Sequence, residues 1–316
     1  MNNQAQKTAT DATHRSTKHT HEPPLRDHTD ARPVAADAGA PAHIAADRSS
    51  IVQLDPDHPG FRDAEYRARR NRIARLALEH EAGRPAPDAP YTEEEHALWR
   101  TVLDALEPRH AEFACAEYLE AVRRLDLPRE RIPQLGEVSE RVRSISGFRL
   151  EPVAGLVEPR VFLESLADGV FLCTQYIRHH STPLYTPEPD VVHELLGHAA
   201  TLASPRLAAL NRLFGEAVKC ARAAEDFERL ARVYWFTVEF GVVREGGEVK
   251  AYGTGLLSSA GELEAMRDAR LLPLDADAAA RADYDPTRFQ PTLFCADSFD
   301  SVCETLYTYL TRVSWC

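Results

Sequence analysis

The segments TPEPDVVHELLGH (residues 186–198) and VYWFTVEFG (residues 233–241) decide how this sequence is interpreted. They place His193, His198 and Glu239 among apolar residues. A buried carboxylate without a partner costs several kcal/mol, and a bound metal ion removes that cost. Two histidines and one carboxylate are the donor set of a non-haem iron(II) centre that keeps open coordination positions. We therefore predict that these three residues bind iron.

The spacing of the two histidines bears on the main alternative, a zinc hydrolase. In the zinc-protease motif HExxH the histidines are four residues apart, so about 400° of helical rotation returns them to one face. Here five residues separate His193 from His198, which leaves the rings about 140° apart on an ideal helix. A distorted turn or a helix end must bring them together. A hydrolase with Glu194 as general base is therefore disfavoured.

The composition excludes other classes of protein. The chain has 316 residues, is 44% hydrophobic and carries a net charge of −12, with a pI near 5.6. It has no basic stripe for nucleic acid and no stretch of roughly 18 apolar residues that could span a membrane. Without an apolar signal core or paired CxxC motifs, six scattered cysteines indicate reduced thiols in the cytoplasm.

Two regions differ in composition. Residues 1–51 are rich in Ala, Thr, Asp, His and Pro, so we expect a disordered low-complexity tail. Residues 52–316 should form one folded domain, mainly α with a small β component. Helix starts are predicted at Asp63, at a Thr92–Glu95 capping box, at Ser204–Pro205 and near Ser298, and a β-hairpin around Gly246–Gly247.

Several strings in the right order resemble a known family. Beside the two segments above, they are LDPDHPGFRDAEYRARR (54–70), GFRLEPVAGL (147–156), CTQYIRH (173–179) and AYGTGLLSSAGE (251–262). Together they are similar to the catalytic domain of the pterin-dependent aromatic amino acid hydroxylases, over residue 52 to the C-terminus. The resemblance implies the aromatic amino acid hydroxylase catalytic-domain fold. It also implies a monooxygenase that uses Fe(II), O2 and tetrahydrobiopterin or a related tetrahydropterin.

The resemblance also assigns roles to residues. It implies that the amino-acid substrate is contacted by Arg178, Thr186, Pro187, Trp235, Phe240, Ser258 and Glu262. The implied pterin contacts are Gly155, Leu156, Val157, Phe162, Glu194 and Ala231, and the implied catalytic residues are Glu194 and Tyr234. Arg178 has the geometry to hold an α-carboxylate in a bidentate manner, although a structural salt bridge to Asp190 is an equal alternative on residue type alone.

The sequence indicates the substrate and the oligomeric state less directly than it indicates the cofactors. Conversion of phenylalanine to tyrosine, as by a phenylalanine 4-monooxygenase, is the favoured reaction. Trp235 matches the phenylalanine and tyrosine hydroxylases better than the tryptophan hydroxylases, which resemble each other in having phenylalanine there. Tyrosine or tryptophan hydroxylation and 3-hydroxylation of phenylalanine stay open. Leu172 and Ser50 depart from animal relatives, which have a pterin-side histidine and a lid tyrosine at these positions. The chain has no additional heptad-bearing helix after Cys316, so a monomer is expected, with small molecules as its only partners.

Overall fold

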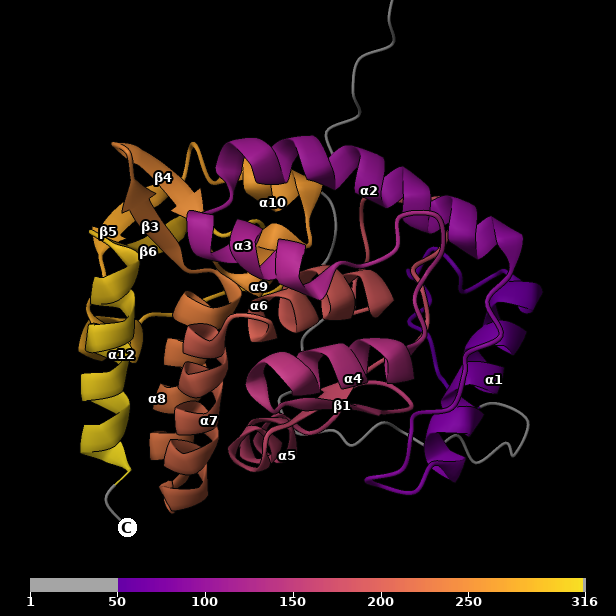
Figure 1. The fold of residues 1–316 in the computed structure, drawn as a ribbon, viewed down its shortest axis with the longest axis horizontal. Helices are drawn as coiled ribbons and strands as arrows, with labels where there is room; N and C mark the ends of the chain where they lie inside the picture. Colours follow the sequence, from indigo (N-terminus) through magenta and orange to yellow (C-terminus); the bar gives the residue numbers. More distant parts are fainter. Residues whose placement is uncertain (1–50, 315–316) are drawn as a thin grey trace, which may run out of the picture. The chain divides into compact units, whose positions relative to one another are not determined.

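The computed structural model of the protein describes residues 51–314, so the tail expected at residues 1–51 lies outside the described residues apart from Ile51. Helices dominate this part of the chain, as predicted (Figure 1). They are α1 (Ala64–Glu79), α2 (Glu93–Phe113), α3 (Ala116–Leu125), α4 (Leu135–Ser146), α5 (Pro159–Ser165), α6 (Ala200–Leu202), α7 (Pro205–Cys220), α8 (Ala224–Tyr234), α9 (Thr254–Leu257), α10 (Ala260–Ala265), α11 (Ala276–Ala279) and α12 (Phe299–Val313). Three further helical segments are not α-helical: the 3-10 turn η1 (Leu166–Asp168) and the π-helices η2 (His193–Ala199) and η3 (Trp235–Glu239).

The predicted helix starts are confirmed, because each capping side chain binds a backbone N–H within its own first turn. The Asp63 carboxylate accepts from Tyr66 N at 3.0 Å and begins α1. Thr92 and Glu95 form the reciprocal capping box of α2. Ser204 caps α7, with a proline in the first turn, and Ser298 caps α12.

The strands form two small sheets. Strands β1 (Arg149–Pro152) and β2 (Val170–Cys173) pair in parallel. Strands β3 (Val242–Glu245), β4 (Glu248–Ala251), β5 (Arg270–Pro273) and β6 (Thr292–Ala296) form a second sheet in the order β4-β3-β6-β5. The predicted hairpin joins β3 to β4, and both turn residues have positive φ, 60° at Gly246 and 89° at Gly247. Two successive positive φ angles are typical of the type I′ turn that suits a two-residue hairpin.

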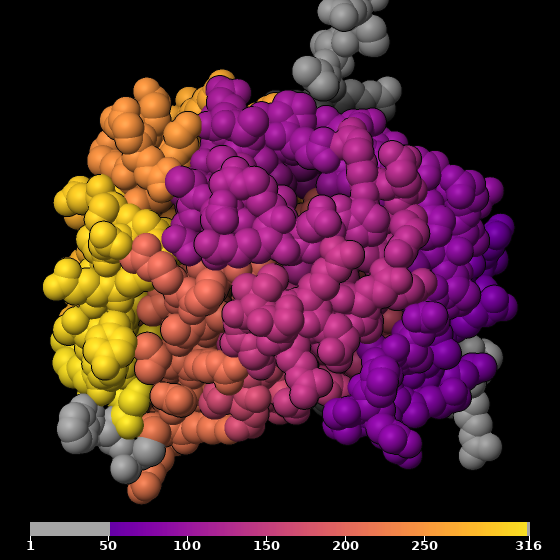
Figure 2. All heavy atoms as spheres, in the orientation of Figure 1, coloured from indigo at the N-terminus to yellow at the C-terminus, as the bar shows by residue number. Residues whose placement is uncertain are grey.

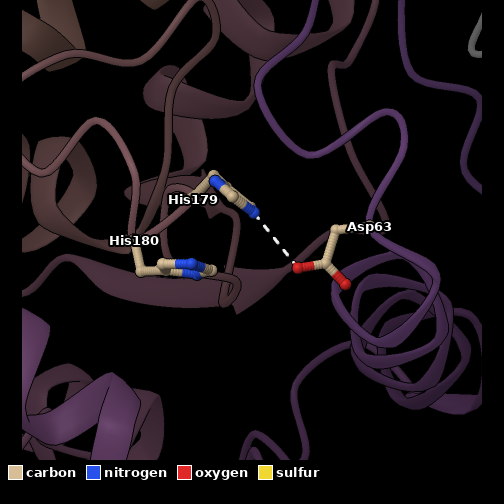
Figure 3. A group of neighbouring side chains, drawn as sticks. All are labelled: Asp63, His179 and His180. Carbon is tan, nitrogen blue, oxygen red and sulfur yellow. Dashed lines mark hydrogen bonds and ion pairs between the residues drawn. The ribbon is translucent and has the colours of Figure 1, made fainter.

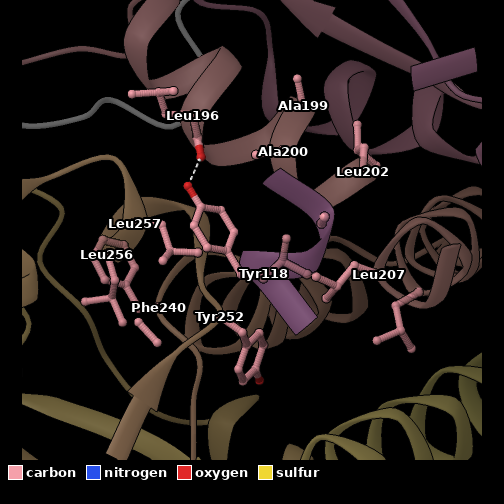
Figure 4. Packing of buried hydrophobic residues seen from close by; sticks show 14 of the residues in the cluster. Tyr118, Leu196, Ala199, Ala200, Leu202, Leu207, Phe240, Tyr252, Leu256 and Leu257 are labelled. Atoms are coloured by element: carbon pink, nitrogen blue, oxygen red, sulfur yellow. Dashed lines mark hydrogen bonds between the residues drawn. The ribbon is translucent and has the colours of Figure 1, made fainter. Parts of the chain in front are cut away.

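The core surrounds the π-helix η2. Helices α7, α8 and α12 run side by side, while α3 and α9 pack close to η2 and α6 (Figure 1). Side chains of α2–α4 cover the middle of the face seen in Figure 2. Figure 4 shows Tyr118 of α3 reaching from this layer toward η2, where its hydroxyl donates to the carbonyl of Leu196 at 2.7 Å. Leu256 and Leu257 of α9 lie in the same buried cluster.

The cysteines differ from the expectation in one respect. Cys115, Cys173, Cys295 and Cys303 are free. Cys220 at the end of α7 is disulfide-bonded, so the prediction of uniformly reduced thiols is wrong at this position. The scattered spacing of the cysteines contains no signal for this bond. Among residues 51–314, none of the helices combines the length and apolar composition needed to cross a bilayer.

Candidate metal centre

The π-helix η2 explains how two histidines five residues apart face one point. In a π-helix the backbone hydrogen bonds join residues i and i+5, so these residues lie one above the other. His193 and His198 stand at this separation within η2, and their ring centroids are 4.7 Å apart. The distorted turn that the sequence required is this wide helical turn. Gly197 lets it pack closely, since a Cβ there would lie 3.0 Å from the carbonyl oxygen of Thr254.

Glu239 approaches both rings from a second π-helix. Helix α8 continues directly into η3, and Glu239 is the last residue of η3. One carboxylate oxygen lies 3.1 Å from His198 Nε2, and the other lies 4.0 Å from His193 Nε2. The hydroxyl of Thr254 donates to Glu239 Oε2 at 2.7 Å. The structure therefore brings together the three residues that the sequence nominated as ligands.

The electrostatics of these groups are typical of a site that holds a cation. Burial favours the neutral form of Glu239, but the facing His198 and His193 outweigh it and lower the pKa of this carboxyl to about 2. Burial, with His198 second, lowers the pKa of His193 to about 4. Burial also opposes charge on His198, but Glu239 raises its pKa overall. An ionised carboxylate thus faces a neutral imidazole of His193 in a buried space.

A second carboxylate, Glu194, lies beside the same histidines. Single donor atoms of His193, Glu194 and His198 fall within 4.8 Å of one another, so proximity alone would also admit Glu194 as a ligand. However, Glu194 Oε1 accepts two hydrogen bonds of 3.0 Å from the backbone and hydroxyl of Thr174. Burial raises the pKa of Glu194 to about 7, against opposing effects of His198 and Thr174. Glu239, which is ionised and lies 3.1 Å from His198 Nε2, is therefore the better candidate for the third ligand.

Ser258 holds the orientation of His193, one of the predicted ligands. Its Oγ lies 2.9 Å from His193 Nδ1, and the side chain is buried. A histidine can offer the Nε2 lone pair to a metal only when its proton is on Nδ1, so Ser258 must accept this hydrogen bond in the metal-binding tautomer. The sequence predicted Ser258 on the substrate side and missed this contact. It also missed the role of Thr254, for which the sequence contains no signal.

Arg178 makes the salt bridge that was the alternative to substrate binding. Its Nε and Nη2 donate to the two oxygens of Asp190 at 2.9 and 2.8 Å, and both side chains are buried. Asp190 Oδ1 also accepts from the backbone N–H of His193 at 3.2 Å. The Nε edge of the guanidinium is therefore occupied, and Nη1 donates one N–H to the carbonyl of Pro183 at 3.4 Å. One N–H each of Nη1 and Nη2 is left to meet a ligand. The ion pair also anchors the start of η2.

The other predicted substrate residues fall into separate groups. Trp235 stacks on Tyr284 with ring centroids 4.4 Å apart, and Phe240 lies 4.6 Å from Trp235 on centroids. Trp235 Nε1 donates to Gln290 Oε1 at 3.2 Å, and Gln290 N donates to Glu262 at 3.4 Å. Burial raises the pKa of Glu262 to about 7. The sequence had not indicated Tyr284 or Gln290, which lie on either side of a turn at residues 285–288.

The remaining two residues on the predicted substrate side lie in the segment before η2. The Thr186 hydroxyl donates to the carbonyl of Glu188 at 2.7 Å, and Pro187 lies between these two residues.

Only some of the residues predicted to contact the pterin lie near His193 and His198. The Phe162 ring lies 6.4 Å from His198 and 6.2 Å from Tyr234, measured between centroids. Tyr234 donates its hydroxyl to Asn211 at 3.2 Å, and burial raises the pKa of Tyr234. Gly155, Leu156 and Val157 lie between β1 and α5, where Leu156 is 59% exposed, and Ala231 packs at the edge of the core from α8. Leu172 is the third residue of β2, and Ser50 lies outside the described residues.

Comparison with known proteins identifies the family. The sequence model of the family described as biopterin-dependent aromatic amino acid hydroxylase matches residues 46–315. The chain belongs to this family. It is 45% identical to mouse phenylalanine-4-hydroxylase over 268 residues, covering 83% of this chain and 59% of the relative. It is also 45% identical to mouse tyrosine 3-monooxygenase over 266 residues, covering 82% of this chain and 53% of the relative. The chain thus spans little more than half the length of these relatives.

A solved structure agrees with the fold. Phenylalanine hydroxylase from Chromobacterium violaceum, with bound iron(III) and oxidised 7,8-dihydrobiopterin, superposes with a TM-score of 0.69 at 30% identity. The match covers 77% of this chain and 90% of that chain. The expected family and its mainly α fold are therefore confirmed.

Proposed function

We propose that this chain is a monooxygenase that hydroxylates the ring of a free aromatic amino acid with O2, Fe(II) and a tetrahydropterin. The observation that carries the proposal is the convergence of His193, His198 and Glu239, with the carboxylate ionised and only 14% exposed. This donor set fits iron(II), because it leaves coordination positions open for reactants. The iron and dihydrobiopterin of the Chromobacterium violaceum enzyme support the same cofactors here.

In this proposal His193, His198 and Glu239 hold the iron, which together with the reduced pterin supplies the oxidising chemistry when bound. The chain's own contribution is to position the reactants and to exclude water. The pterin site comprises Phe162, Glu194 and Ala231 with the segment Gly155–Val157. Glu194 is kept beside the histidines by Thr174 and would meet the pterin or a water molecule there. Tyr234 supports the Phe162 ring edge-to-face.

We propose L-phenylalanine as the substrate and L-tyrosine as the product. Trp235 and Phe240 form an aromatic surface that would face a flat apolar ring. The guanidinium N–H groups of Arg178 that Asp190 and the Pro183 carbonyl leave free would meet the α-carboxylate. Thr186, Pro187, Ser258 and Glu262 complete the proposed pocket. The two mouse relatives have equal identity, so sequence similarity does not discriminate between phenylalanine and tyrosine.

The proposal also assigns residues 52–316 as the catalytic domain and describes the protein as a cytoplasmic monomer that binds small molecules. Size-exclusion chromatography with light scattering checks the monomer. Neither residues 1–51 nor a nucleic-acid or membrane partner is needed for the reaction as proposed.

The test is an aerobic incubation of the iron-loaded protein with tetrahydropterin and, separately, phenylalanine, tyrosine and tryptophan. Product mass and the ring position of the new hydroxyl are then measured. We expect tyrosine from phenylalanine at the highest rate, and no product without pterin or in Glu239→Gln. A main product from another amino acid would retain the reaction class and overturn the choice of substrate. Turnover by a variant without iron would overturn the proposed function itself.

A further inference from the structure

A second group of metal-binding side chains lies at the start of α1, apart from the histidines of η2. It consists of Asp63, His179 and His180 (Figure 3). Each of the three offers one ligand atom within 4.8 Å of the other two. His179 is buried, Asp63 is half-buried and His180 is exposed, so the group is open to solvent on one side. None of these residues has a part in the proposed reaction.

The distances are close to those of an ion-binding site. Zinc binds imidazole nitrogen and carboxylate oxygen at about 2.0–2.2 Å in a tetrahedral arrangement, which separates two ligands by roughly 3.4 Å. His179 Nε2 and Asp63 Oδ2 are 3.2 Å apart. His180 needs only a side-chain rotation to approach them, because it is exposed. Water would take the remaining coordination position.

Two of the three ligands are already fixed by other contacts. Asp63 uses Oδ1 to cap α1 through Tyr66 N, which leaves Oδ2 directed at His179. The Tyr66 ring packs edge-to-face on His179 with centroids 5.0 Å apart. Ser181 Oγ lies 2.7 Å from His179 Nδ1. A ligand histidine with its second ring nitrogen hydrogen-bonded is the usual arrangement at a metal site.

The surroundings of His179 allow the change of tautomer that metal binding requires. Without metal, Nε2 carries the proton and donates it to the Asp63 carboxylate. For metal binding the neutral ring must adopt the other tautomer, with the proton on Nδ1. Ser181 Oγ is positioned to accept that hydrogen bond, and the backbone N–H of Ser181, which donates to Nδ1 at 3.3 Å in the structure, would then turn away. The change therefore requires no charged imidazole, and the ion takes the place of the bridging proton between His179 and Asp63.

We propose that Asp63, His179 and His180 bind one divalent transition-metal ion of the zinc type, independently of the iron centre. Imidazole and carboxylate donors suit such ions, whereas Ca²⁺ and Mg²⁺ prefer oxygen ligands only. The bound ion links the N-terminus of α1 to the segment that follows Arg178. It would therefore hold together two parts of the chain that are more than 100 residues apart, as the Asp63–His179 hydrogen bond spans 116 positions.

The experiment is a Zn²⁺ titration of the full chain with its iron in place. Bound zinc and iron are measured by plasma mass spectrometry after desalting, and zinc affinity by calorimetry. The variants are His180→Ala, which removes an exposed ligand, and Asp63→Asn, which removes the charge but keeps an N-cap acceptor. The control is His43→Ala, because five histidines precede residue 51 and could bind zinc themselves.

We expect the wild type and His43→Ala to bind one zinc ion that His180→Ala and Asp63→Asn lose or bind at least tenfold more weakly. Iron content should be equal in all four proteins, which separates this site from the iron centre. Zinc binding that is unchanged in His180→Ala, or that disappears in His43→Ala, would overturn the proposal. A zinc ion that only replaces iron would overturn it as well.

Discussion

Replacing Ser258 by alanine should weaken iron binding although none of the three ligands is changed. In the structure Ser258 Oγ lies 2.9 Å from His193 Nδ1 and donates to the carbonyl of Gly255 at 3.5 Å, so it can accept from the tautomer whose Nε2 lone pair is free. In Ser258→Ala the His193 ring is free to rotate or to adopt the other tautomer. Loss of such an outer hydrogen-bond partner typically lowers metal affinity about 10–100-fold, which is about 1.4–2.7 kcal/mol.

The measurement is an anaerobic titration of the metal-free protein with Fe(II) in competition with a coloured chelator. Ser259→Ala is the matched control, because its hydroxyl caps α10 by accepting from Glu262 N and does not contact His193. The control should lose about 1 kcal/mol of unfolding free energy and keep its iron affinity. An iron affinity of Ser258→Ala within twofold of the wild type would refute the reasoning, because His193 would then be held by other contacts.

Three further predictions concern the surroundings of the site. Arg178→Lys should raise the Michaelis constant for the amino acid about tenfold. It should also lower the melting temperature, because lysine cannot make both bonds to Asp190. An unchanged Michaelis constant would leave Arg178 a structural role only. Tyr118→Phe should lower the free energy of unfolding by about 1–3 kcal/mol, measured by urea denaturation, because the buried carbonyl of Leu196 loses its donor; an unchanged midpoint would contradict this. The wild type should prefer phenylalanine over tryptophan at least tenfold in kcat/KM, about 1.4 kcal/mol. Trp235→Phe should shift that ratio toward tryptophan. An unaltered ratio would show that Trp235 does not determine the choice between the two substrates.

The elements that the sequence predicts correctly are those with short-range causes. Asp63 and Thr92 bind backbone groups within their own turns, so the start of a helix is evident from a few adjacent letters. The same holds for Gly246 and Gly247, whose positive φ angles suit the hairpin turn. His193 and Glu239 were identifiable because polar side chains in apolar segments need a partner.

Contacts between distant segments could not be predicted in this way. Ser258 lies 65 residues from His193, and Tyr118 lies 78 residues before Leu196, so no local pattern connects them. The approach of His179 to Asp63 has the same origin. For Arg178 the residue type allowed two roles. Only the fold shows that Asp190 already occupies one edge of its guanidinium.

The wide turn of η2 keeps the helix beyond it in phase. Removing one residue between His193 and His198 would restore a four-residue spacing, at which an ordinary α-helix again presents both rings to one side. Five residues of η2 and four residues of an α-helix each make about one turn, so later positions such as Thr201 and Leu202 would stay buried. The extra residue between the two histidines is therefore absorbed within the turn that carries them, and the helix that follows does not constrain the length of the motif.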